Sequence, residues 1–63
     1  MEFIHNNETL IKIQFNKKMQ YFEALTAAMN PKTKKKLQKF GNEYNCFAAS
    51  EIDCKNKIID ILD

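Results

Sequence analysis

The chain has 63 residues, of which 44% are hydrophobic, and this size predicts one small domain spanning 1–63. A mean hydropathy of −0.51 argues against a membrane-spanning segment, and the first residues lack the charged-then-apolar pattern of a secretion signal. Ten lysines and no arginine stand against eight acidic residues, for a net charge of +2. Residues 1–42 carry +5 and residues 43–63 carry −3, an asymmetry that favours a polyanionic partner or head-to-tail association.

The longest periodic pattern lies between residues 8 and 29. Apolar side chains recur there at intervals of three and four residues, at Ile11, Phe15, Met19, Phe22, Leu25 and Met29. This spacing predicts an amphipathic helix over 8–29. Asn7 suits the N-cap position, and Asn30-Pro31 ends the pattern because a residue before proline is disfavoured in the α conformation.

The same region supports a second interpretation. Between residues 9 and 15, every second residue falls on the same face of an extended chain. One face carries Thr9, Ile11, Ile13 and Phe15, and the residues between them lie on the other. This is the period of a strand, and residues 3–9 resemble a turn between two strands. A β-hairpin over residues 1–15, packed on two or three helices, is therefore the alternative. We favour the helix because its period continues far beyond Phe15.

The segment PKTKKKLQKFG, residues 31–41, carries five of the ten lysines, the only proline and the only glycine. Proline is favoured at the first position of a helix and glycine just beyond its last position. The segment therefore predicts a second helix over 31–40. On such a helix Lys32, Lys35, Lys36 and Lys39 fall within an arc of about 100°, while Leu37 and Phe40 turn toward a core.

The C-terminal third predicts a turn or short helix over 43–49 and a third helix over 51–62. A break between them keeps the Glu51 and Lys55 pair out of the middle of an apolar face. Ser50 with Asp53 three residues later resembles a capping box, which marks the start of the last helix. The run 58–62 is also compatible with a short strand.

These segments together predict an all-α fold, a small three-helix domain without linker or repeat. The expected core draws apolar side chains from every segment. It consists of Ile11, Phe15, Met19, Phe22, Leu25, Met29, Leu37, Phe40, Phe47, Ile52, Ile58, Ile59 and Leu62.

Residues suited to catalysis are few and isolated. His5 is the only histidine, and no nucleophile has an evident base. Gly41 is the only glycine, so a glycine-rich phosphate loop is excluded, and the cysteine spacing is not that of a zinc site. We therefore expect a protein that is not an enzyme and uses no metal, cofactor or small-molecule substrate.

The two cysteines, Cys46 and Cys54, lie eight residues apart. On one continuous helix that separation is about 12 Å, too far for a disulfide. We expect free thiols in a reducing cytoplasm. Lysine, asparagine, isoleucine, phenylalanine, tyrosine and methionine make up more than half of the chain, and their AT-rich codons indicate a phage or bacterial source with an AT-rich genome.

The lysine-rich segment is the best candidate for a functional surface. Lysines neutralise phosphates whatever the nucleic-acid sequence, and without arginine the segment lacks the planar fork that reads guanine. We expect a small binding module that contacts nucleic acid non-specifically through a lysine-rich helix over 32–39. The expected contact residues are Lys32, Lys34, Lys35, Lys36, Lys39 and Tyr44, whose ring is suited to base stacking. A helix-turn-helix around Gly41 is less well supported, because residues 42–45 contain no basic side chain.

The alternative function is that of a small regulatory protein, which binds a protein partner or self-associates through exposed apolar helix faces. It is suggested by the small size of the chain and by the wide apolar surface that a helix over 8–29 would carry. Attachment to a membrane surface is not expected, since Leu37 and Phe40 are the only apolar anchors of the lysine-rich helix.

Overall fold

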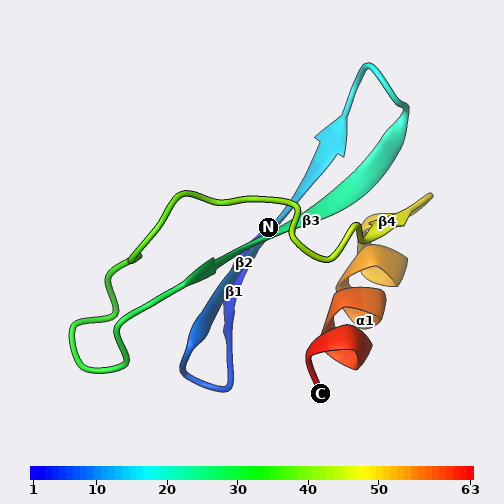
Figure 1. The fold of residues 1–63 in the computed structure, drawn as a ribbon. Helices are drawn as coiled ribbons and strands as arrows, with labels where there is room; N and C mark the ends of the chain where they lie inside the picture. The colour runs from blue at the N-terminus through cyan, green and yellow to red at the C-terminus, as the bar shows by residue number, and fades with distance from the viewer.

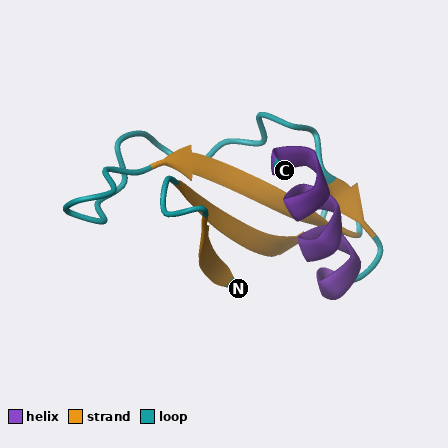
Figure 2. Cartoon of the chain, turned by 90° about the horizontal axis from the view of Figure 1, so that it is seen from below, coloured by secondary structure: helices purple, strands orange, loops and turns teal.

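The computed structural model describes residues 1–63 as an antiparallel sheet with one helix packed on one of its faces (Figures 1 and 2). The elements in chain order are β1 (Glu2–His5), β2 (Thr9–Asn16), β3 (Tyr21–Ala28), β4 (Phe47–Ala48) and α1 (Glu51–Leu62). The four strands lie in the sheet in the order β1-β2-β3-β4. No helix of the structure combines the length and the apolar character needed to cross a membrane.

The predicted all-α, three-helix fold is wrong, because the segment 8–29 forms β2 and β3 instead of a helix. The two strands pair along their full lengths, from Thr9 opposite Ala28 to Asn16 opposite Tyr21. Phe15 and Phe22, assigned to successive turns of a helix, are cross-strand partners whose ring centroids lie 5.1 Å apart. The helical spacing was misleading because it joined residues of two strands and of the turn between them.

The N-terminal β-hairpin of the alternative interpretation is present in the structure, where β1 pairs with β2. Asn6 and Asn7 adopt φ values of 51° and 55°, a left-handed conformation that asparagine tolerates and that the tight turns of hairpins require. The Glu8 amide donates to the His5 carbonyl at 3.2 Å and closes the turn. The two or three helices of that alternative are wrong, since α1 is the single helix.

The turn between β2 and β3, residues 17–20, contains Met19, which had been assigned to the core. The Asn16 carboxamide oxygen accepts the Met19 amide at 3.0 Å, and the Asn16 carbonyl accepts the Gln20 amide at 2.7 Å. Gln20 completes the reversal with a φ of 61°. These bonds hold Met19 at the tip of a hairpin, where its side chain is exposed.

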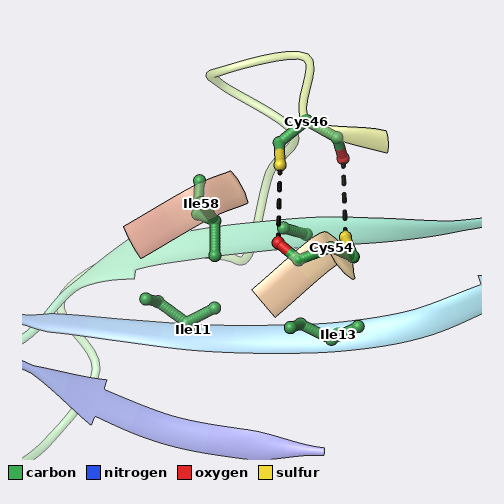
Figure 3. Packing of buried hydrophobic residues seen from close by; sticks show 6 residues of the cluster. Ile11, Ile13, Cys46, Cys54 and Ile58 are labelled. Atoms are coloured by element: carbon green, nitrogen blue, oxygen red, sulfur yellow. Dashed lines mark hydrogen bonds between the residues drawn. The ribbon is translucent and has the colours of Figure 1, made fainter. Parts of the chain in front are cut away.

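The core lies between α1 and the face of the sheet that carries Ile11 and Ile13 (Figure 3). The cluster consists of Ile11, Ile13, Ala24, Cys46, Cys54 and Ile58, and Phe3, Phe22, Ala48 and Leu62 pack against it. Among the predicted core residues, burial is confirmed for Ile11, Met29 and Ile58, and it is wrong for Phe15, Met19, Leu37 and Ile52, which are exposed. Leu25, Phe40, Phe47 and Ile59 are half-buried. Ile13 and Ala24 were not expected in the core, because the helical period assigned to 8–29 passes over alternate residues of the two strands. Cys46 and Cys54 were also outside the expected core, although both are buried.

The helix predicted over 51–62 is confirmed as α1, and the strand considered for 58–62 is wrong. Ser50 is the N-cap residue, and its hydroxyl accepts the Asp53 amide at 3.2 Å. This bond satisfies one of the free amides of the first turn. Residues 43–49 form a turn followed by β4, so no short helix is present there.

Candidate nucleic-acid interface

The lysine segment, defined here as residues 31–39, is a projecting loop, and the helix predicted over 31–40 is wrong. In Figure 1 it is the green loop at the end of the molecule away from α1, and Figure 2 shows the same separation. The lysines therefore share one loop, but they do not share one face of a helix.

Asn30 determines the conformation in which this loop begins. Its side-chain oxygen accepts the amides of Lys32 at 2.8 Å and Thr33 at 3.3 Å. The Asn30 carbonyl accepts the Lys34 amide at 2.8 Å, and the Asn30 amide donates to the Lys35 carbonyl at 2.9 Å. Asparagine side chains that bond to nearby amides compete with helical hydrogen bonding. Lys34 has a φ of 62°, which a right-handed helix does not allow.

The second half of the segment returns along the free edge of β3. The Leu37 amide donates to the Ala28 carbonyl at 2.9 Å, and Lys36 forms an isolated bridge with Met29. Further on, Gly41 and Thr26 exchange two hydrogen bonds of 2.9 and 3.0 Å. Gly41 is thus a sheet-edge residue and does not end a helix. The edge of β3 offers this segment backbone partners that an isolated helix would have had to supply itself.

The five lysines of the loop are exposed and carry no acidic neighbour. The single ion pair of the structure joins His5 and Asp63, 2.9 Å apart, so no lysine ammonium lies within 4.0 Å of a carboxylate. Lys34 donates instead to the side-chain oxygen of Asn7 in the β1–β2 turn. The positive charge of the loop is therefore not neutralised within the chain.

Phe40 connects the loop to the sheet. The Lys36 ammonium lies 4.8 Å from the centroid of its ring and the Lys12 ammonium of β2 lies 5.8 Å away, both within the range of a cation–π interaction. Lys12 alternates along β2 with the buried Ile11 and Ile13 and so lies on the face opposite α1. The cationic surface thus extends from the loop onto this open face of the sheet.

The structure places Lys32, Lys34, Lys35, Lys36 and Lys39 on the loop, and places Tyr44, with 40% of its surface exposed, between Gly41 and β4. The sequence analysis missed Lys12, although the alternation along residues 9–15 that predicted a strand would have placed it on the outward face. Phe40, expected in the core of a helical domain, has instead a half-buried ring within 5.8 Å of two lysine ammonium groups.

The other end of the open sheet face has a different character. Tyr21 and Phe47 form an aromatic pair with centroids 4.6 Å apart. Next to them in the strand register, Glu23 accepts a hydrogen bond of 2.9 Å from the Gln14 carboxamide. The Glu23 carboxylate disfavours phosphate at this end, so the cationic surface is limited to the loop, Lys12 and Phe40.

Elsewhere the structure has no pocket and no group of three or more histidine, cysteine or acidic side chains placed to share a metal ion. Comparisons of the chain with family models, with curated proteins and with solved structures give no match. Function is therefore inferred from the charge, exposure and contacts of the chain itself.

Proposed function

We propose that this protein is a non-catalytic binding module that contacts nucleic acid non-specifically through the lysine segment. One observation carries the proposal: five exposed lysines share a projecting loop in which no acidic residue is present and no carboxylate reaches an ammonium group. When such lysines neutralise phosphates, cations condensed on the nucleic acid are released, and the entropy of that release favours binding. The absence of arginine removes bidentate base recognition, which accounts for the lack of sequence preference.

Two aromatic residues enter the proposal: Phe40 on the cationic surface and Tyr44, which follows the loop in the chain. The exposed part of Tyr44 offers a ring face to an unpaired base, a contact that contributes about 1–3 kcal/mol where it forms. Phe40 keeps Lys12 and Lys36 together on the sheet side of the loop. We place the protein in the cytoplasm, where nucleic acid is available and the free thiols of Cys46 and Cys54 are kept reduced.

Fluorescence anisotropy with a labelled oligonucleotide at about 50 and 200 mM salt tests the proposal. Binding should be measurable at the lower concentration and collapse at the higher one. The double variant Lys35→Gln/Lys39→Gln removes two loop charges whose side chains make no hydrogen bond or ion pair. It should reduce the slope of log K against log salt by about 1.4 to 1.8 if both lysines contact phosphate.

The matched control is Lys17→Gln/Lys18→Gln, which removes the same charge from the β2–β3 turn. This variant should keep the wild-type slope. Equal losses in the two double variants would mean that net charge alone matters, and no binding at the lower salt concentration would end the proposal.

Self-association or binding of a protein partner is the second candidate. It is supported by large apolar side chains that the fold leaves exposed on β2, the β2–β3 turn, the loop and α1: Phe15, Met19, Leu37, Ile52 and Ile61. Light scattering after size exclusion, over a roughly hundredfold range of concentration, tests self-association by mass action. A molar mass that stays at the monomer value throughout that range excludes it.

A further inference from the structure

The feature of interest is the buried pair of cysteines at the centre of the core. Cys46 directly precedes β4, and Cys54 lies in the first turn of α1. The chain reverses between them at the Ser50 N-cap, so the two residues face each other (Figure 3). The separation of about 12 Å expected on one continuous helix therefore does not apply.

The contacts between the two residues are reciprocal. The Cys46 thiol lies 3.8 Å from the Cys54 carbonyl oxygen, and the Cys54 thiol lies 4.0 Å from the Cys46 carbonyl oxygen. Burial, with the charge and the hydrogen bond of the Cys46 side chain, raises the pKa of Cys54 to about 11. Each thiol thus lies against the carbonyl oxygen of the other cysteine, so the two side chains are neighbours in the core (Figure 3).

The backbone holds both cysteines in this arrangement. The Cys46 amide donates to the Asn42 side-chain oxygen at 3.3 Å, and its carbonyl accepts the Ala24 amide of β3 at 3.0 Å. The Cys54 amide donates to the Ser50 carbonyl at 3.0 Å. Little conformational freedom remains to be lost if the two sulfur atoms are joined, and this gives the pair a high effective concentration.

We propose that Cys46 and Cys54 form a reversible intramolecular disulfide, which ties the segment before β4 to the first turn of α1. The oxidant is a low-molecular-weight disulfide. One cysteine thiolate attacks it, forms a mixed disulfide and releases one small thiol; the second cysteine thiolate then attacks the protein sulfur of that mixed disulfide and releases the other. Two cysteine thiols are oxidised to one disulfide, and one small disulfide is reduced to two thiols.

Burial determines the rate of this reaction. The exposed fractions of Cys46 and Cys54 are 1% and 0%, so a small disulfide reaches them only when the first turn of α1 opens. Thiolate is also scarce, because the pKa of Cys54 is raised. Oxidation is therefore slow, the disulfide is shielded from reduction once formed, and a reducing cytoplasm retains the dithiol form.

The test compares the folded and unfolded wild-type chain at equilibrium. Protein is incubated with a series of ratios of reduced to oxidised glutathione, in native buffer and in concentrated guanidinium chloride, then acid-quenched, alkylated and weighed by mass spectrometry. The expected product is a monomer lighter by two hydrogen atoms with Cys46 linked to Cys54. In terms of the squared concentration of reduced glutathione divided by the concentration of oxidised glutathione, the folded chain should be half-oxidised at a value about tenfold higher than the unfolded chain.

Melting temperatures complete the design. The oxidised protein should melt roughly 10 °C above the reduced one. Each of the single variants Cys46→Ser and Cys54→Ser should melt at the same temperature in oxidising and in reducing buffer. If either variant does not fold, the glutathione titration of the folded and unfolded wild-type chain still tests the proposal. A folded chain that keeps two alkylatable thiols where the unfolded chain is oxidised, or that accumulates glutathione adducts or dimers, overturns the proposal. These outcomes are independent of nucleic-acid binding.

Discussion

The layer built from β1, β2, β3 and α1 differs from the lysine segment in what holds it in place. In the layer, side chains of Ile11, Ile13 and Ile58 meet in the interior, so its stability depends on apolar burial. In the lysine segment, backbone hydrogen bonds and the Asn30 side chain fix the path while every lysine remains in water. The loop lysines are therefore accessible to a ligand, because the fold does not depend on burying them.

The sharpest test of this comparison uses two isoleucines of the same helix. Ile58 is 0% exposed and Ile52 is 57% exposed. Ile58→Ala should lower the free energy of unfolding by about 2–5 kcal/mol, since it removes buried methyl groups and leaves a cavity. Ile52→Ala should change it by no more than about 0.5 kcal/mol. Urea denaturation followed by circular dichroism measures both, and equal losses would show that Ile52 is also packed.

A pH series tests the burial of the cysteine pair in the reduced protein. Burial raises the pKa of Cys54 from 9.0 to about 11. The unfolded chain therefore releases this proton first, and the free energy of unfolding falls between those two pH values, by at most about 1.4 kcal/mol per pH unit. Below pH 9 this contribution is constant.

The control for the pH series is Cys54→Ala, which lacks the thiol and should lose less stability over the same range. Chemical denaturation of both proteins at several pH values measures the difference. Parallel curves for wild type and variant would contradict a raised pKa at Cys54.

The N-cap of α1 gives a smaller expected effect. Ser50→Ala removes the acceptor of the Asp53 amide and should lower the free energy of unfolding by about 1 kcal/mol. Ser50→Asp keeps an acceptor at the same position and should stay within about 0.5 kcal/mol of wild type. Thermal unfolding measures both substitutions, and an equal loss in both would mean that the hydroxyl is needed for some other contact.

The smallest expected effect belongs to the lysine segment. Lys35→Gln/Lys39→Gln should change the free energy of unfolding by no more than about 0.5 kcal/mol, since both side chains are exposed and unpaired. Urea denaturation at low and high salt measures this. A loss above about 1 kcal/mol would mean that the loop lysines support the fold, and the contrast with the layer would not hold.

The same contrast explains which sequence predictions failed. Pro31 and Gly41 were interpreted as the two ends of a helix, but proline is equally favoured in a turn and glycine is compatible with a sheet edge. The Asn30 side chain closes a turn next to Pro31, and Gly41 pairs with the edge of β3. At residues 8–29, both a helical and an alternating period were present in the sequence. The helical period is the longer of the two, but it runs across the hairpin turn at residues 17–20 and so joins residues of different strands.

Sequence alone determined the features whose causes lie within a few residues of each other. The Ser50 cap, the length of α1, the left-handed potential of Asn6 and Asn7, and the exposure of a run of lysines are of this kind. The formation of two strands by residues 8–29 and the contact between Cys46 and Cys54 depend on tertiary interactions. Strand pairing stabilises Thr9 only once Ala28 lies opposite, and that free energy comes from a partner distant in sequence.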